Sequence, residues 1–204
     1  MIQSLIAGWN SRENSRIIYL QESIEMFPDT FVRPIGQDLI DDLAGFCERI
    51  EIAGSLRRCK TIVHDIDVVA IPKFIEVNDQ TLFGDPFMQD LLERKLAQMC
   101  LLRHLELEAN GSRIKRFLKT VDGDTVPIDL YIANEQTWST TLLIRTGSRL
   151  HNIKLAKKAR ELHMHLLGDG SGLMTAGGSV LPVQSEEEIF QLLGLTYRIP
   201  EERD

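Results

Sequence analysis

Hydrophobic positions recur at helical spacing in three stretches of the first half of the chain. These stretches cover residues 12–26, 36–49 and 88–103. Pro28 follows the first stretch and is expected to stop that helix, because proline cannot continue a helical hydrogen-bond ladder. The pattern therefore predicts three amphipathic helices before residue 104.

Between and after these helices, the pattern changes to the short runs and alternation that are typical of β-strands. Residues 49–55 (RIEIAGS) predict a short strand that ends in a Gly-Ser turn, and residues 65–72 (DIDVVAIP) predict a strand that Pro72 closes. Three further segments are separated by Asn-Gly and Asp-Gly turn signals, which predicts a hairpin meander over residues 104–109, 113–121 and 125–133. Together the elements predict an α+β fold, with an antiparallel or mixed sheet flanked by helices.

The pattern of residue types changes again from about Thr146. Residues 152–166 read as a basic helix, and glycines crowd residues 168–178. Ser185 followed by Glu188 has the spacing of a capping box, which predicts a helix start near the end of the chain. We therefore expect a boundary near residue 143, which gives an N-terminal helical segment of unknown role (1–32), a main domain (33–143) and a small α+β domain (144–204).

The amino-acid composition agrees with this fold class and restricts the cellular setting that we expect. The 204 residues are 43% hydrophobic and 26% charged, as in ordinary globular proteins. No apolar run reaches eighteen residues, and the N-terminus has no basic region before its short apolar stretch, so neither a membrane span nor a secretory signal is expected. Three sparse cysteines indicate a reducing, intracellular (cytoplasmic) setting.

The charge is unevenly distributed along the chain. The net charge of −7 argues at first against a nucleic-acid partner. However, residues 113–119 and 145–160 hold ten of the 23 basic residues and none of the 30 acidic ones. Such stretches are compatible with a solvated surface and equally with a local patch that attracts a polyanion.

Carboxylates supply the strongest candidate chemistry. Asp65 and Asp67 are two residues apart on a predicted strand, so both side chains point to one face, and Asp129 lies on another predicted strand. Like charges this close repel one another unless a cation lies between them, and oxygen-liganded Mg²⁺ suits such a set. Three carboxylates can hold two metal ions roughly 3.5–4 Å apart for an in-line displacement. A single aspartate on a strand is more commonly a solvent-facing residue.

An anion-binding turn is expected just before these carboxylates. Gly54 and Ser55 end a strand, and Arg58 comes seven residues before Asp65. Glycine lets the backbone approach a phosphate, the serine hydroxyl can donate, and arginine can pair with phosphate oxygens in fork geometry. Phosphoryl transfer requires a phosphate cradle and metal carboxylates side by side.

These motifs carry a family resemblance. AGSLRR followed by DIDVV, with a later strand carrying IDLY, resembles the nucleotidyltransferase superfamily. RTGSRLHN, a basic helix and the tail LPVQSEEEIFQLLGLTYRIPEERD resemble the palm and thumb of X-family DNA polymerases, over residues 33–204. The chain has no room for the lyase and fingers domains, so it resembles the reduced palm-plus-thumb type found in viruses or phages, with 33–143 as palm and 144–204 as thumb.

The resemblance implies roles for individual residues. Asp65, Asp67 and Asp129 match the catalytic, metal-binding carboxylates, and Asp129 would lie closest to the primer 3′-hydroxyl. The nucleotide-binding positions are matched by Gly54, Ser55, Arg58, Gly147, Ser148 and Asn152, of which Asn152 would meet the minor-groove edge of the incoming base. Lys154, Lys157 and Lys158 would lie along DNA phosphates, and Arg33 loosely matches a further phosphate-contacting arginine.

The sequence departs from the family pattern at several of these places. Ile144 and Arg145 replace the Tyr-Phe pair that discriminates against ribose, so ribonucleotide exclusion is not predicted. Ala156 replaces an arginine that reads the template minor groove, which predicts low fidelity or loose template dependence. Pro127 replaces an arginine two residues before the third aspartate, so the orientation of Asp129 must come from elsewhere; His64 also replaces a glycine.

The resemblance thus implies a monomeric DNA-directed DNA polymerase that uses two Mg²⁺ ions, or Mn²⁺, and serves gap filling or DNA repair. Its partners would be gapped or primer-template DNA and a dNTP, with no membrane. Two alternatives stay open: a nucleotidyltransferase acting on RNA, protein, a small molecule or an untemplated DNA end, and a non-catalytic DNA-binding accessory protein.

Overall fold

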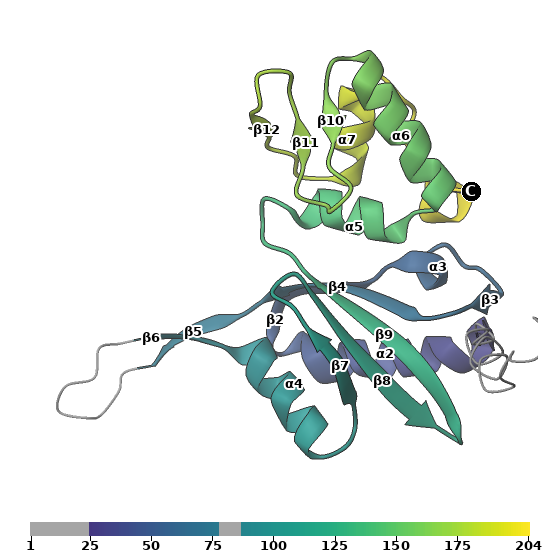
Figure 1. Cartoon of the computed structure of the whole chain (residues 1–204), viewed down its shortest axis with the longest axis vertical. Coiled ribbons are helices and arrows are strands. Elements are labelled where there is room, and N and C mark those ends of the chain that lie inside the picture. Colours follow the sequence, from purple (N-terminus) through teal and green to yellow (C-terminus); the bar gives the residue numbers. More distant parts are fainter. Residues whose placement is uncertain (1–24, 78–86) are drawn as a thin grey trace, which may run out of the picture.

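A mixed five-stranded sheet with the strand order β2-β4-β9-β8-β7 organises the first part of the molecule. The computed structural model describes residues 25–77 and 87–204. The sheet is built from β2 (Cys47–Ile52), β4 (Ile66–Pro72), β9 (Asp124–Ile132), β8 (Ile114–Val121) and β7 (Glu106–Asn110), with β4 and β9 parallel and the other pairs antiparallel. The predicted α+β architecture, with a mixed sheet flanked by helices, is confirmed (Figure 1).

The two faces of the sheet have different roles, because side chains alternate along each strand. On the helix face, Val68, Ile128 and Leu130 join one core cluster with residues of α2 (Asp29–Ala44) and α4 (Leu91–Leu101). On the opposite face, Val69 and Tyr131 join another cluster with residues of α5 (Trp138–Thr146). We call this second face the cleft face, because it carries Asp67 and Asp129 beside the apolar contacts.

The predicted strands and meander agree with the structure, but one helix was predicted wrongly. The expected helix over 36–49 begins seven residues earlier, as α2, and ends at Ala44. Pro34 lies inside α2, where it lacks the donor for one helical hydrogen bond, while Val32, Leu39 and Leu43 bury the helix against the sheet. The residues after Gly45 leave the helix and pair with β4 as strand β2.

Five short elements among the described residues complete the sheet region. β1 (Phe27–Pro28) pairs with β3 (Ile62–Val63), and α3 (Gly54–Arg57) connects β2 to the segment before β4. β5 (Phe74–Val77) pairs with β6 (Phe87–Asp90) in a ribbon that projects from the side of the sheet (Figure 1). The helix predicted over 12–26 falls almost wholly on residues 1–24, which lie outside the described residues, as does most of the proposed segment 1–32.

The carboxyl-terminal region forms a second layer over the cleft face. It contains α5, α6 (Arg149–Glu161), the three-stranded sheet of β10 (His165–Leu166), β11 (Leu173–Met174) and β12 (Val180–Leu181), α7 (Glu186–Leu192) and a 3₁₀ turn (Pro200–Glu202). The predicted helix start at Ser185 is confirmed, since the Ser185 hydroxyl accepts the Glu188 N–H at 3.2 Å, while the Glu188 carboxylate accepts the Gln184 N–H rather than the Ser185 N–H of a full capping box. The expected basic helix over 152–166 is α6, shifted toward the N-terminus by the Ser148 cap.

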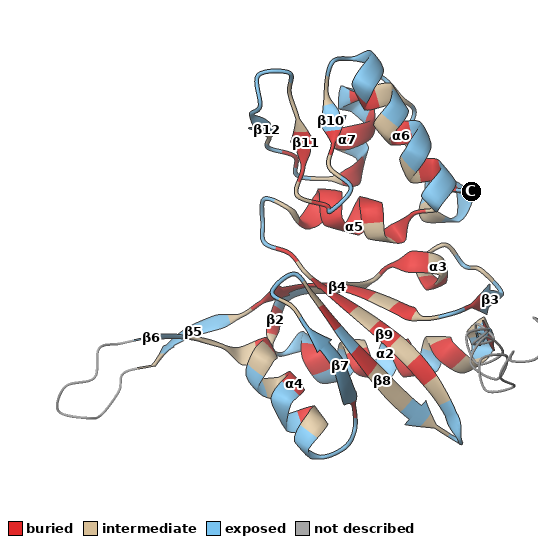
Figure 2. Ribbon diagram, in the orientation of Figure 1, coloured by how far each residue is buried: buried red, intermediate tan, exposed pale blue. Residues whose placement is uncertain are grey.

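Helix α5 connects the two layers and is buried along almost its whole length (Figure 2). Trp138 and Leu142 pack with the cleft face of the sheet, whereas Leu143 and Ile144 pack into the core of the carboxyl-terminal region. The predicted boundary at 143/144 falls inside this helix, and the three-segment division stays a prediction. None of the helices in residues 25–77 and 87–204 is both long and apolar enough to cross a bilayer.

Candidate active site

The sheet brings the predicted carboxylates together through strand register. Asp67 on β4 and Asp129 on β9 are direct register partners on adjacent parallel strands. Asp65 lies just before β4, two residues from Asp67, and therefore on the same side of the chain. The three carboxylates thus lie on the same side of the sheet, although 62 residues separate Asp67 from Asp129 in the sequence.

Burial and mutual repulsion disfavour the ionised forms of two of these acids. Burial, reinforced by the charges of Asp65 and Asp129, raises the pKa of Asp67 to about 7. Burial also raises the pKa of Asp65, and the charge of Asp129 adds to this effect. A cation placed among these carboxylates would relieve both costs.

The predicted phosphate turn packs directly on this cluster. Gly54 opens α3 in the left-handed region, with φ +59°, and a Cβ there would lie 1.9 Å from the Oδ2 atom of Asp67. Only glycine fits this close approach. The backbone N–H of Ala53 donates to the carbonyl of Asp67 at 2.7 Å and fixes the turn to β4.

One cleft of about 610 Å³ joins the turn, two of the carboxylates and the carboxyl-terminal region. The structure brings seven of the predicted site residues to its lining: Gly54, Ser55, Arg58, Asp65, Asp67, Gly147 and Asn152. Ser148 adjoins the cleft and caps α6, because its hydroxyl accepts the N–H of His151 at 3.2 Å. The roles predicted for these residues stay predictions, but their convergence from separate segments is a fact of the fold.

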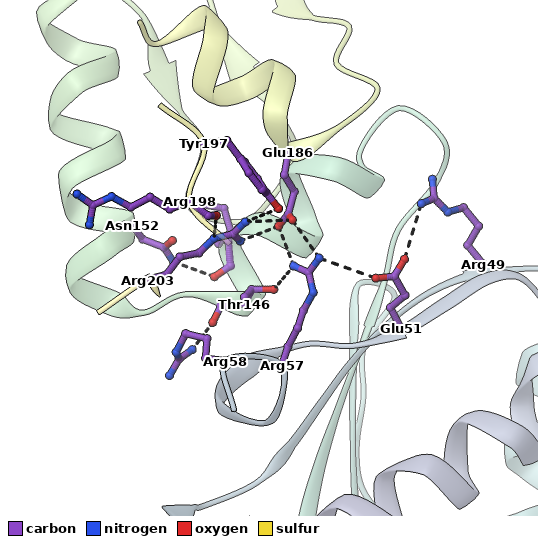
Figure 3. A network of polar contacts seen from close by, with 11 residues as sticks. Arg49, Glu51, Arg57, Arg58, Thr146, Asn152, Glu186, Tyr197, Arg198 and Arg203 are labelled. Carbon is purple, nitrogen blue, oxygen red and sulfur yellow. Dashed lines mark hydrogen bonds and ion pairs between the residues drawn. The ribbon is translucent and has the colours of Figure 1, made fainter. Parts of the chain in front are cut away.

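Two consecutive arginines of α3 and its C-cap connect the turn to the carboxyl-terminal region. The Arg58 guanidinium donates to the carbonyl of Thr146 and lies against Gly147, whose φ of +73° leaves space for it. Arg57 points to the other side, where it donates to Glu186 at 2.8 and 3.0 Å (Figure 3). Burial lowers the pKa of Arg58, in keeping with a cation that lacks a direct carboxylate partner.

Asn152 holds an incomplete set of hydrogen bonds in the cleft. Its Nδ2 donates to the carbonyl of Ile144 at 2.8 Å, while its Oδ1 is buried without a partner among the described residues. A buried amide oxygen of this kind is costly unless a donor reaches it. The free acceptor is therefore a natural contact point for a ligand group.

The residues of α6 that line the cleft are not the lysines for which the family resemblance implies contacts with DNA phosphates. The helix turns Arg149, Asn152, Ile153, Ala156 and Arg160 into the cleft lining. Lys154 instead donates to the carbonyl of Asp204 at 3.2 Å, and Lys158 pairs with Glu161 at 3.3 Å. The helical spacing of Arg149 and Arg160 relative to Asn152 was the available signal for this face, since residues three or four apart share a helix face.

Two cations on the cleft face were not predicted as site residues. Arg145 lines the cleft, stacks over the Tyr131 ring at 4.3 Å and donates to the carbonyl of Asp169. Arg116 on β8 is the cross-strand partner of Asp129 and pairs with it at 3.0 Å. Arg33, by contrast, pairs with Asp29 and donates to the carbonyl of Leu56, so it supports α3 from behind.

The carboxylates fit a divalent cation in chemistry and register. They offer hard oxygen donors, and the raised pKa values of Asp65 and Asp67 mark a shortage of positive charge around them. Within the described residues, no three acidic, histidine or cysteine side chains converge as a ready-made metal site. The Asp129 carboxylate is engaged by Arg116, so a rearrangement of that pair would complete the set.

Comparison with known proteins gives a consistent result. Residues 141–204 match the family described as DNA polymerase beta thumb. The chain is similar to the DNA polymerase/3′-5′ exonuclease PolX of Bacillus subtilis (strain 168), with 25% identity over 98% of this chain and 33% of that protein. It is also similar to DNA polymerase lambda of Rattus norvegicus, with 28% identity over 74% of this chain and 28% of that protein.

The chain therefore spans about a third or less of the length of these two relatives. The matched thumb segment corresponds to most of α5, α6, α7 and the small sheet of the carboxyl-terminal region. The thumb match and the two relatives show that this chain is similar to X-family DNA polymerases, and the α+β architecture agrees with that similarity.

Proposed function

We propose that this protein is a DNA polymerase that transfers a deoxynucleoside monophosphate from a dNTP to a DNA 3′-hydroxyl and releases pyrophosphate. One observation carries the proposal: Asp67 and Asp129 are register partners beside Asp65, on a face that opens to the turn at Gly54. This juxtaposition of carboxylates and a phosphate cradle is what phosphoryl transfer requires. The similarity to X-family DNA polymerases points to the same chemistry.

In this proposal each part of the cleft has a task. Asp65, Asp67 and Asp129 would hold two divalent cations, Mg²⁺ or Mn²⁺, which supply charge stabilisation for the transferred phosphoryl group when bound. Ser55 and Arg58 would hold the triphosphate. For Arg58, this means an exchange of the Thr146 carbonyl for phosphate oxygens.

The carboxyl-terminal region would supply the contacts to base, sugar and DNA. Asn152, which lines the cleft, would meet the minor-groove edge of the incoming base, and Gly147 and Ser148 would lie beside the sugar. Arg149 and Arg160 line the same cleft, and Lys154, Lys157 and Lys158 adjoin it on other sides of α6. A nucleic-acid acceptor is favoured over a protein or a small molecule because this helix concentrates positive charge beside the cleft.

Gap filling in DNA repair, inside the cell, is the role that we propose for this activity. The support for this role is the similarity to X-family DNA polymerases. A virus or phage source is part of the same proposal, on the ground of the sequence resemblance.

A terminal-transferase-like activity is the second candidate, and Ala156 favours it. Ala156 lines the cleft one helical turn after Asn152. Its methyl group cannot donate to a template base, so the contact that would couple addition to a template has to come from another residue. Loose template dependence is the expected consequence.

Primer extension tests the proposal. The substrate is a DNA duplex with a one-nucleotide gap, each dNTP is supplied singly, and Mg²⁺ or Mn²⁺ is added. We expect insertion of the complementary nucleotide, reduced by at least about a hundredfold in Asp129→Ala. Addition of every dNTP regardless of the template would favour the terminal transferase. No addition with either metal, by a protein that binds gapped DNA, would refute the polymerase assignment and revive the accessory role.

A further inference from the structure

Asp129 differs from Asp65 and Asp67 because an arginine side chain is paired with its carboxylate. Arg116 on β8 faces it directly across the sheet, and its Nε and Nη2 atoms donate to the two oxygens of Asp129 at 3.0 and 3.3 Å. Within the described residues, Asp65 and Asp67 form no ion pair. The cleft face therefore carries a row of two carboxylates and one guanidinium across β4, β9 and β8.

A second donor reaches the same carboxylate. The Tyr131 hydroxyl donates to the Oδ2 atom of Asp129 at 3.2 Å. Tyr131 is two residues after Asp129 and lies on the same face of β9, where its ring packs beside Trp138 and under Arg145. Three donors from two strands thus fix the orientation of the Asp129 carboxylate.

The Arg116 pair is poorly suited to a purely structural role. The Arg116 side chain is 55% exposed, whereas the Asp129 side chain is 13% exposed. Ion pairs with one exposed partner contribute little to folding, because water and salt screen them and the long side chain loses entropy. A guanidinium in this position can swing into solvent at low cost and release Asp129.

We propose that Arg116 is a positioning residue that holds Asp129 on the β8 side, opposite to Asp67, and competes with divalent cations for its carboxylate. The proposal rests on the proposed function, because it assigns Asp129 to the metal-binding set. Arg116 donates to both oxygens of Asp129, so a metal ion that binds either oxygen has to share it with the guanidinium and lies close to its positive charge. Arg116 then sets the metal concentration at which the site fills.

The test measures metal binding without DNA or nucleotide. Binding of Mn²⁺ is followed by the electron paramagnetic resonance signal of the free ion, with the full chain. In Arg116→Ala, we expect the Mn²⁺ dissociation constant to fall by about three- to tenfold, because a competing cation is removed. Arg116→Lys keeps a cation and is expected to stay near wild type. Arg94→Ala, an exposed arginine of α4 that contacts only Gln89 among the described residues, is the matched control and should change nothing.

A double-mutant cycle separates the pair from a general charge effect. In an Asp129→Asn background, Arg116→Ala should no longer change Mn²⁺ binding, since the shared carboxylate is gone. Thermal unfolding of every variant checks that the fold persists, and Arg116→Gln provides a longer side chain in case Arg116→Ala does not fold.

The outcomes distinguish this inference from the polymerase assignment. Tighter Mn²⁺ binding by Arg116→Ala supports the inference even if the wild-type protein extends no primer. Unchanged or weaker binding overturns it even if the protein is an active polymerase. Absence of Mn²⁺ binding at millimolar concentration in both wild type and Arg116→Ala also overturns it.

Discussion

Glu186 and Asp67 are both shielded from water, but their pKa values are shifted in opposite directions. Glu186 at the start of α7 is only 6% exposed, and it receives two hydrogen bonds from Arg57 and two from Arg203 (Figure 3). Burial alone would raise the pKa of Glu186, but the arginines from both sides lower it overall. Asp67 is half-buried and lies beside two further acids, and its pKa rises to about 7.

The difference separates a structural ion pair from a site that requires a ligand. At the junction of the sheet region and the carboxyl-terminal region, the charges of Glu186, Arg57 and Arg203 satisfy one another within the fold. At the cleft face, Asp65 and Asp67 lie close to Asp129, and neither forms an ion pair among the described residues. Sites with such uncompensated, perturbed acids are where function is expected, because their stabilisation comes from a ligand rather than from the chain.

The largest expected effect on stability comes from the removal of the Glu186 carboxylate, at the junction of the sheet region and the carboxyl-terminal region. Glu186→Ala leaves the guanidinium groups of Arg57 and Arg203 without their shared carboxylate, and the Arg203 side chain is fully buried. Removal of one partner from a buried ion pair costs about 3–5 kcal/mol in the free energy of unfolding. Urea denaturation followed by circular dichroism measures this change.

Glu51 provides the matched control, since it also contacts Arg57, at 3.9 Å. Its side chain is 44% exposed, so Glu51→Ala is expected to cost less than about 1 kcal/mol. Equal costs for the two glutamates would contradict the description of Glu186 as the centre of the junction.

The next largest expected effect is an increase in the free energy of unfolding, caused by a substitution in the cleft. The pKa of Asp67 rises from the ordinary 3.8 to about 7 on folding, so the folded protein binds a proton more tightly than the unfolded chain. Stability therefore falls as pH rises from about 4 to 7, and the penalty is complete above pH 7. Asp67→Asn removes this penalty. We expect it to stabilise the metal-free protein at pH 8 by roughly 2–4 kcal/mol.

Thermal unfolding at pH 8 and at pH 4.5 checks the sign. The advantage of Asp67→Asn should be large at the higher pH and nearly vanish at the lower one. Added Mg²⁺ should stabilise the wild-type protein more than the variant, because the cation relieves the same repulsion. A variant that is less stable than wild type at pH 8 would show that Asp67 serves the fold rather than a ligand.

The contrast between these regions also explains what the sequence could predict. Alternation and turn signals predict β4, β8 and β9, and the spacing of Asp65 and Asp67 predicts their common face. The pairing of β4 with β9 is not readable from local pattern, so the meeting of Asp67 and Asp129 came from a family resemblance and is now explained by register. Long-range pairing depends on tertiary packing, which a local pattern does not contain.

The side chains that complete each charge cluster were the least predictable. Glu186 was visible only as part of a helix start, and its partner Arg57 is 129 residues away in the sequence. Arg116 belongs to a basic stretch that reads equally as a solvated surface, and only the register with Asp129 gives it a specific position. The α2 boundaries were missed for a related reason, because burial of Val32 against the sheet outweighs the helix-breaking tendency of Pro34.

The third prediction compares two arginines of α6 with two lysines of the same helix. Arg149 and Arg160 line the cleft, whereas Lys154 and Lys158 are engaged by the Asp204 carbonyl and by Glu161. The double variant with both arginines changed to alanine should bind gapped DNA about tenfold more weakly, and its logarithmic salt dependence should lose about two units of slope. Changing both lysines to alanine removes the same charge and should have a smaller effect. Fluorescence anisotropy across a salt series measures both, and equal losses would favour phosphate contacts along the lysines.

The smallest effect distinguishes two helix caps of the same geometry. Ser148 caps α6 and Ser185 caps α7, and each hydroxyl accepts a backbone N–H at 3.2 Å. Either serine changed to alanine should cost about 1 kcal/mol in the free energy of unfolding, because one helix donor loses its partner. Only Ser148 adjoins the cleft, next to Gly147, so only Ser148→Ala should also raise the KM for the dNTP in primer extension. A KM that rises equally in Ser185→Ala would mean that the carboxyl-terminal region responds as one unit to any loss of stability, and that Ser148 makes no separate contact with the nucleotide.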